Sequence, residues 1–240
     1  SSLGSCSSTI ELHPRAVIGE NSDRHDWRQL QPHPHRPPMP DPAKLPAFTS
    51  HLIAMALPME SRGLLEQAGA PLLYTGVGKV RAAMALTRRL ADYRHSGVAM
   101  PLVVNLGTAG SRHLKAGSLV GCDQFSQRDM DVSGLGFARG ETPYDNVPAL
   151  IEMPRHFSNL PHCVCSTADS FATHEHALEN NGVVDMEAFA LARVCVAEGA
   201  RFACAKFVTD GADGTAADDW RTALAAASIA VAALYATMPR

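Results

Sequence analysis

The sequence lacks the marks of a membrane protein and of a secreted one. No apolar run approaches the roughly 18 uninterrupted residues of a membrane-spanning helix. The N-terminal residues do not combine a basic region with an apolar run, which is the pattern of a secretory signal. Three of the six cysteines lie in apolar runs, where a free thiol behaves as a small hydrophobic side chain. We therefore expect a reduced, cytoplasmic protein without a membrane partner. The cysteines are Cys6, Cys122, Cys163, Cys165, Cys195 and Cys204.

Clustered charge and paired metal ligands are also scarce. The net charge is only −3, and Lys and Arg form no cluster, which argues against a nucleic-acid partner. Cys163-x-Cys165 and His174-x-His176 each place two metal-ligating side chains close together. Neither has a second pair at zinc spacing. The sequence therefore predicts no bound metal.

One glycine-rich segment is similar to a nucleotide-binding loop but lacks its defining residues. Gly76-Val-Gly78-Lys79 has no upstream glycine at the spacing of a phosphate loop, and Val80 replaces the magnesium-binding Ser or Thr. It also lacks the third glycine of the dinucleotide fingerprint. We interpret Gly78 as a small residue that lets a helix pack against a strand, and we expect no cofactor.

The N-terminal fifth of the chain differs from the rest. The segment Gln31–Pro42 is rich in proline and cannot continue a helix or a central strand. We expect residues 1–48 to be a disordered or loosely attached tail. His33 and His35 lie in it, and two histidines in such a segment are usually solvated. Residues 49–240 are expected to form the catalytic domain, and an apolar content of 46% allows a substantial core.

From His51 onward, strand and helix patterns alternate. Short apolar runs predict strands, and apolar residues at helical spacing predict the segments between them. Residues 130–160 are rich in Pro and Gly and indicate a long functional loop. The alternation predicts an α/β sandwich around a mixed, mostly parallel sheet. Strands are expected at 51–57, 72–75, 102–106, 117–125, 162–168, 183–186 and 203–209. Helices are expected at 61–67, 79–95, 187–199 and 215–235, the last with a Thr215-x-x-Asp218 capping box.

Two pairs of carboxylates follow apolar runs near the end of the chain. Val184-Asp-Met-Glu-Ala188 ends one run, and Thr209-Asp-Gly-Ala-Asp213 ends another. Open α/β sheets bind ligands at the carboxyl ends of their strands. The sequence therefore predicts an active site that contains buried acids.

Five motifs occur in one order along the chain and together resemble the nucleoside phosphorylase superfamily. The pattern is most similar to the methylthioadenosine/S-adenosylhomocysteine nucleosidases and related bacterial purine nucleosidases, over about residues 51–238. The resemblance implies a three-layer αβα sandwich, a nucleoside substrate, and a homodimer or larger homo-oligomer. The motifs are Gly76-Val-Gly-Lys-Val80, Asn105-Leu-Gly-Thr-Ala-Gly110, Asp169-Ser-Phe171, Val184-Asp-Met-Glu-Ala188 and Thr209-Asp-Gly-Ala-Asp213.

The resemblance also implies a catalytic pair. Cleavage of an N-ribosidic bond leaves negative charge on the departing purine, and a buried carboxylic acid can protonate it. By resemblance that acid is Asp210, although an Asp before Gly is also common in turns. Glu60 matches the glutamate that activates the attacking water, whereas a solvated residue at a helix start is the alternative.

Further residues match the family's substrate-binding positions. Glu187 matches the glutamate that accepts both ribose hydroxyls and stabilises the oxocarbenium-like transition state, and Met186 matches the methionine against the sugar. Phe171 matches the aromatic residue that stacks on the purine. The alternative for Glu187 is a glutamate that stabilises the first turn of a helix. The alternative for Met186 and Phe171 is an ordinary core side chain. Ala172 is expected at the base edge, and Thr108, Ala109 and Gly110 are expected along the sugar and base.

One position bears on the choice between water and phosphate as nucleophile. Phosphorylases of the hexameric branch carry an arginine where this chain has Asn105, which favours hydrolysis over a purine nucleoside phosphorylase that uses inorganic phosphate. Arg62 and Arg128 remain candidate phosphate ligands. A non-catalytic nucleoside-binding module is a third hypothesis, but binding alone does not require an acid such as Asp210.

The chain departs from the family pattern in three places. Only fifteen residues (61–75) separate Glu60 from Gly76, fewer than in the family. Thr209 replaces the usual serine, and the segment before His51 has no counterpart. The 5′ substituent of the substrate is therefore left open. In the family a neighbouring subunit helps to close the pocket that holds this 5′ substituent. Residues 130–144 are expected to contribute to that contact.

Overall fold

The computed structural model describes residues 50–172 and 182–239, all within the unit Asp41–Arg240. The expectations for residues 1–48, including His33 and His35, lie outside the described residues. So do those for Cys6 and for His174-x-His176. Within the described part, no helix is long and apolar enough to cross a membrane.

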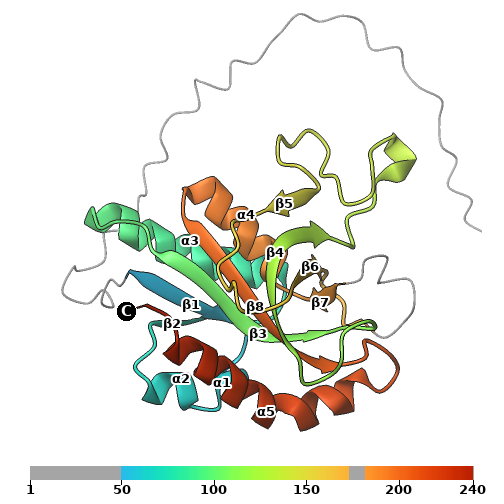
Figure 1. Cartoon of the computed structure of the whole chain (residues 1–240). Coiled ribbons are helices and arrows are strands. Elements are labelled where there is room, and N and C mark those ends of the chain that lie inside the picture. Colours follow the sequence, from blue (N-terminus) through green and yellow to red (C-terminus); the bar gives the residue numbers. More distant parts are fainter. Residues whose placement is uncertain (1–49, 173–181, 240) are drawn as a thin grey trace, which may run out of the picture. The chain divides into compact units, whose positions relative to one another are not determined.

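The predicted alternation of strands and helices is present (Figure 1). The strands are β1 (His51–Met55), β2 (Leu72–Tyr74), β3 (Leu102–Gly110), β4 (Leu119–Gln127), β5 (Leu150–Glu152), β6 (His162–Thr167), β7 (Val183–Asp185) and β8 (Arg201–Asp210). The helices are α1 (Pro58–Ser61), α2 (Leu64–Gln67), α3 (Lys79–Ser96), α4 (Ala188–Glu198) and α5 (Ala216–Ala236), with a 3-10 turn at Ser133–Leu135.

The strands form one mixed sheet, as the sequence predicts. Its order is β2-β1-β3-β7-β6-β4-β5, and β8 pairs with both β3 and β4. Among the described strands, five pairings are parallel and three are antiparallel. Because β8 links β3 to β4, the strands β3, β8, β4, β6 and β7 close into a ring. The carboxyl ends of β3 and β8 lie side by side in this ring.

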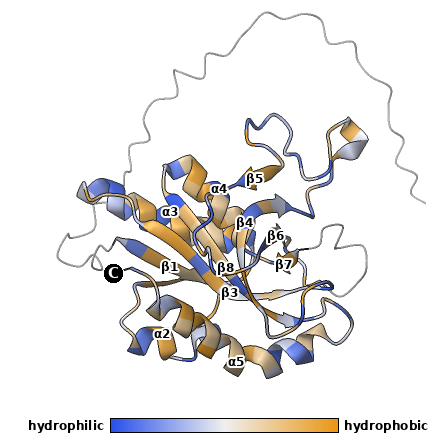
Figure 2. Ribbon diagram, viewed as in Figure 1, coloured by the Kyte–Doolittle hydropathy of each residue, from blue (hydrophilic) through white to orange (hydrophobic). Residues whose placement is uncertain are grey.

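Alternating residues of the strands fill two separate cores. In β1, Leu52 and Ala54 pack with α3 and α4, whereas Ile53 and Met55 pack with α2 and α5. Successive side chains of a strand point to opposite faces, so this division shows that helices cover both faces of the sheet. Figure 2 shows hydrophobic residues along the strands between the two helix layers. The three-layer αβα sandwich is thereby confirmed.

The segment expected to be one helix over 61–67 is two short ones. Arg62 and Gly63 adopt left-handed backbone conformations, with φ of 49° and 79°. These conformations end α1 and redirect the chain into α2. Glu60 is therefore a buried residue within the single-turn helix α1 rather than a solvated residue before a longer helix.

Three further details differ from the prediction. The third strand does not end at residue 106, because β3 continues to Gly110 along β8. The expected long loop over 130–160 contains β5, which pairs antiparallel with β4. The capping box of α5 is absent: the Thr215 side chain makes no cap bond. Instead its hydroxyl lies 2.8 Å from both Asp213 Oδ1 and Asp219 Oδ2.

Candidate active site

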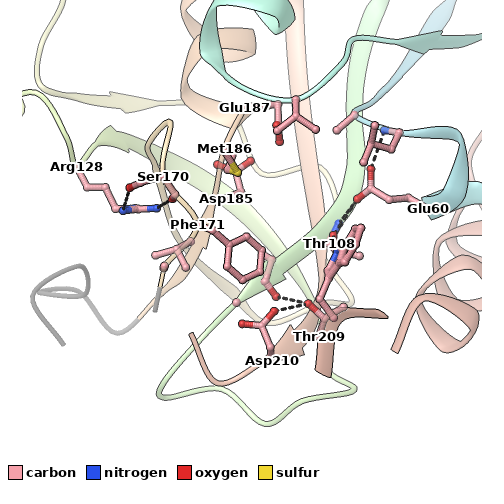
Figure 3. A pocket seen from close by; sticks show the side chains of 18 residues that line it. Glu60, Thr108, Arg128, Ser170, Phe171, Asp185, Met186, Glu187, Thr209 and Asp210 are labelled. Atoms are coloured by element: carbon pink, nitrogen blue, oxygen red, sulfur yellow. Dashed lines mark hydrogen bonds between the residues drawn. The ribbon is translucent and has the colours of Figure 1, made fainter. Parts of the chain in front are cut away.

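A pocket lies at the carboxyl ends of β3, β6, β7 and β8 (Figure 3). The structure brings the nine predicted catalytic and substrate-binding residues to its wall, from segments more than 100 residues apart. They are Glu60, Thr108, Ala109, Gly110, Phe171, Ala172, Met186, Glu187 and Asp210. Their roles remain predictions, but their common location follows from the sheet order.

Asp210 is the last residue of β8 and is 95% buried, with 5% of its surface exposed. The Thr209 hydroxyl donates to its Oδ2 at 2.7 Å, and the Ala212 N–H donates to its Oδ1 at 2.9 Å. A Cβ atom at Gly110 would lie 2.5 Å from Asp210 Oδ1. Because no side chain fits there, glycine at position 110 allows the neighbouring strand to approach this carboxyl group.

Glu187 lies between β7 and α4, at the N-cap position of the helix. Its Oε1 accepts the Gly78 N–H at 2.8 Å. Burial, and next the charge of Asp185, raise the pKa of Glu187 to about 7, against the opposing effects of Lys206 and the Gly78 N–H. A carboxylate offers about four acceptor directions, so most of them remain available to a ligand. Gly78, interpreted from sequence as a packing residue, thus also contributes a donor to the site.

Glu60 reaches the pocket from helix α1. Its Oε1 accepts the Thr108 N–H at 3.0 Å and the Thr108 hydroxyl at 2.9 Å. Its Oε2 accepts the Leu57 N–H at 3.0 Å. Three of about four acceptor directions are therefore filled by the protein. The remaining one suits a single water molecule.

Phe171 follows β6, lines the pocket and is 45% exposed. The preceding residue is fixed by Arg128, whose Nη2 donates to the Ser170 carbonyl at 2.7 Å. Its Nη1 lies 3.4 Å from the Ser170 hydroxyl. In Figure 3, Arg128 and Glu60 lie at opposite ends of the row of labelled side chains. Two of the three nitrogens of the Arg128 guanidinium thus contact the segment before Phe171.

A buried ion pair beneath the pocket was missed by the sequence reasoning. Lys206 Nζ lies 2.9 Å from Asp185 Oδ2, and the two side chains are 2% and 1% exposed. Asp185 also accepts the Thr167 hydroxyl at 2.5 Å and the Ala188 N–H at 2.8 Å. Burial alone would raise the pKa of Asp185, but the Lys206 charge holds it below its usual range. The available signal was a lysine inside the apolar run of β8.

The ion pair gives a stability prediction. Lys206→Met should lower the free energy of unfolding by about 3–5 kcal/mol, because it leaves a buried carboxylate without its partner. The double variant Lys206→Met/Asp185→Asn should recover most of that loss. Urea denaturation of the three proteins measures both effects. A double variant no more stable than the single one would contradict this account.

Trp220 of α5 is another residue that the sequence reasoning missed. It lines the pocket, and its Nε1 donates to the Thr108 hydroxyl at 2.9 Å. Thr108 therefore connects α5 to Glu60. Nothing in the periodicity of α5 marks Trp220 as a site residue, because an aromatic side chain on such a helix is most often part of the core.

Asn105 and Arg62 do not join the site. Asn105 is buried in the sheet, where its amide donates to the Ala54 carbonyl at 3.0 Å. Neither residue is among the side chains that line the pocket. Within residues 50–172 and 182–239, no three His, Cys, Asp or Glu side chains are grouped so that they could hold a metal ion.

Comparisons with known proteins identify the family and its relatives. The family model described as "Phosphorylase superfamily" matches residues 61–238. A 5′-methylthioadenosine/S-adenosylhomocysteine nucleosidase of Haemophilus influenzae is 32% identical over 168 residues, which are 60% of this chain and 69% of that protein.

Two solved structures show the same fold at lower identity. The nucleosidase of that name from Helicobacter pylori, with butyl-thio-DADMe-Immucillin-A, is 21% identical with a TM-score of 0.67, covering 79% of this chain and 98% of that one. Futalosine hydrolase of Helicobacter pylori is 22% identical with a TM-score of 0.63, covering 74% and 92%.

Proposed function

The chain belongs to the phosphorylase superfamily, and we propose that it is a purine nucleosidase within it. It hydrolyses the N-ribosidic bond of 5′-methylthioadenosine, S-adenosylhomocysteine or a similar adenosine derivative, and it releases the free base and the sugar. The observation that carries this proposal is that Asp210, Glu187 and Glu60 line one pocket. Relatives at 32% identity carry the same activity in their names. The activity is assigned to residues 49–240.

The three acids divide the reaction between them. Asp210 protonates the departing purine, which would otherwise leave as an unstable anion. Glu187 accepts the ribose 2′ and 3′ hydroxyls, and its charge stabilises the positive sugar of the transition state. Glu60 orients and activates the attacking water. Met186 packs against the sugar, and Phe171 stacks on the base while Ala172 offers its backbone to the base edge. Thr108, Ala109 and Gly110 form the wall beside them.

The pocket favours water over phosphate as nucleophile. Arginine is the side chain best suited to hold phosphate, because its fork donates two parallel bonds. Asn105 stands at the position of the phosphorylase arginine, and its amide is bonded to the Ala54 carbonyl. Arg128 lines the pocket, but its guanidinium is bonded to Ser170 and lies at the end away from Glu60 (Figure 3).

The pKa of Glu187 leads to a predicted pH dependence. Below about pH 7 Glu187 is protonated, so it loses the charge that stabilises the transition state. We expect kcat/KM, which reports the free enzyme, to fall about tenfold per pH unit on the acidic side. In Asp185→Asn the charge that raises this pKa is gone, and the acidic limb should move to lower pH. Asp213→Asn should leave the limb unmoved. A profile that is flat from pH 5 to 8 would refute the prediction.

The reaction itself is tested with a panel of purine nucleosides, with and without inorganic phosphate. Product analysis should find free base and free sugar, at a rate that phosphate does not change. A sugar 1-phosphate formed only in the presence of phosphate would identify a phosphorylase instead. Binding of adenosine derivatives without turnover would identify a non-catalytic module.

We also propose that the protein forms a homodimer or larger homo-oligomer and that it is cytoplasmic. Residues 130–144 support the self-association: Leu135 is 75% exposed and Tyr144 is 96% exposed, and the Tyr144 ring stacks edge-on against Phe137. Such exposed apolar side chains suit contact with a second copy. Sedimentation of the wild type and of Leu135→Asp/Tyr144→Asp should show a loss of mass in the variant. Equal masses would contradict this contact.

A further inference from the structure

Four cysteine side chains gather in the sheet, away from the pocket. Cys122 is on β4, Cys163 and Cys165 are on β6, and Cys204 is on β8. Cys122 pairs in register with Cys163 on one side and with Cys204 on the other. Cys122, Cys165 and Cys204 belong to one hydrophobic cluster, and Cys163 packs against it. All four are free thiols, and none of them lines the active site described above.

The free thiols of the chain are not chemically equivalent. The Cys122 thiol, and next the Val183 backbone, hold the pKa of Cys163 below its usual value, although burial and Asp123 oppose them. Burial raises the pKa of Cys165 and of the separate Cys195 to about 12. Since the thiolate is the nucleophile, Cys163 is the most reactive of these three.

Solvent exposure also indicates Cys163 as the first thiol to be oxidised. Cys163 is partly exposed, whereas the other free cysteines in the described residues are buried. Cys204 is 1% exposed, and its thiol donates to Asn105 Oδ1 at 3.4 Å. An oxidant that approaches the cluster from solvent therefore meets Cys163 first.

The backbone places Cys122 directly beside Cys163 on the neighbouring strand. Neighbouring strands of a sheet lie about 4.8 Å apart, and disulfides join Cα atoms about 4.4–6.8 Å apart. Cys122 and Cys163 are direct register partners on the parallel strands β4 and β6. The spacing of the two strands is therefore compatible with a disulfide between Cys122 and Cys163.

We propose that Cys163 and Cys122 form a peroxide-sensitive dithiol site, in which Cys163 is oxidised first and Cys122 resolves it. The Cys163 thiolate attacks one oxygen of hydrogen peroxide, the O–O bond breaks, and hydroxide leaves as Cys163 becomes a sulfenic acid. The Cys122 sulfur then displaces the sulfenic oxygen, which leaves as water, and the S–S bond forms. The sum is two thiols plus one peroxide giving one disulfide and two waters.

The full chain carrying Cys6→Ser tests the site without interference from the sixth cysteine. After hydrogen peroxide treatment, unfolding and alkylation, peptide mass spectrometry should find Cys122 joined to Cys163 with the loss of two hydrogens. Dithiothreitol should reverse the bond, and Cys195 should remain fully alkylated. A Cys122–Cys204 bond, or Cys122 and Cys163 as fully alkylated as Cys195, would overturn the proposal.

Single variants separate the two roles. With Cys122→Ser, oxidation should stop at a sulfenic acid on Cys163 that dimedone traps, whereas the matched control Cys165→Ser should still form the disulfide. Cys163→Ser should protect Cys122 from oxidation. If Cys122 in that variant is lost as fast as in the parent chain, Cys163 is not the first thiol to react, and the proposal fails.

Discussion

Asp210→Asn should reduce kcat for an adenosine derivative by on the order of 10²–10⁴-fold, the usual contribution of a general acid. The amide has nearly the same shape and keeps an oxygen for the Ala212 N–H, which now bonds Oδ1. It has no acidic proton to give to the purine. Substrate binding should therefore survive, and steady-state kinetics together with equilibrium binding of the nucleoside measure the two effects separately.

The neighbouring Asp213 supplies the control. Its Oδ1 accepts the Thr215 N–H at 2.9 Å, and it does not line the pocket. Asp213→Asn removes a nearby carboxylate of the same type, so it should leave kcat within about twofold of the wild type, as expected for a residue outside the reaction. If both variants lose activity equally, Asp210 has no special role in the chemistry.

Glu60→Gln should reduce kcat by on the order of 10²–10⁴-fold through loss of the general base. The substitution keeps an oxygen for the Thr108 donors but places an NH₂ group against the Leu57 N–H, which now donates to Oε2. A loss of stability of about 1 kcal/mol should accompany it, since a partly buried donor loses its acceptor. Kinetics below the unfolding temperature of the variant isolate the catalytic part.

Glu66→Gln is the matched control for Glu60. Glu66 lies on α2, accepts the Ser61 hydroxyl at 2.9 Å and is absent from the pocket wall. Its variant should retain turnover. Added phosphate should not restore Glu60→Gln, because phosphate is not the nucleophile in this account. Restoration by phosphate would support the phosphorylase alternative.

The secondary structure was largely predictable because apolar runs and helical spacing reflect burial, which is a local property of the sequence. Local patterns do not specify which strands pair. The pairing of β8 with both β3 and β4 depends on contacts between distant segments. The break at Arg62 and Gly63 was missed because left-handed conformations at a non-glycine residue leave little sequence signal.

The candidate site was less predictable from physical reasoning alone than the secondary structure. Carboxylates after apolar runs indicated an acid-lined pocket on physical grounds, because strand ends meet at one edge of a sheet. The individual roles of Glu60, Phe171 and Met186 came from family resemblance, since each residue type alone is also common in cores and helix starts. The Lys206–Asp185 pair joins residues on two strands, and only the folded structure shows that the two charges meet.

The most direct test compares the wild type and Asp210→Asn on two substrates with different leaving groups. Adenine needs a proton to leave, whereas p-nitrophenolate from a p-nitrophenyl riboside does not. The ratio of wild-type to variant kcat should be on the order of 10² or more for the adenosine derivative and close to one for the p-nitrophenyl riboside. Equal ratios on the two substrates would contradict proton donation by Asp210.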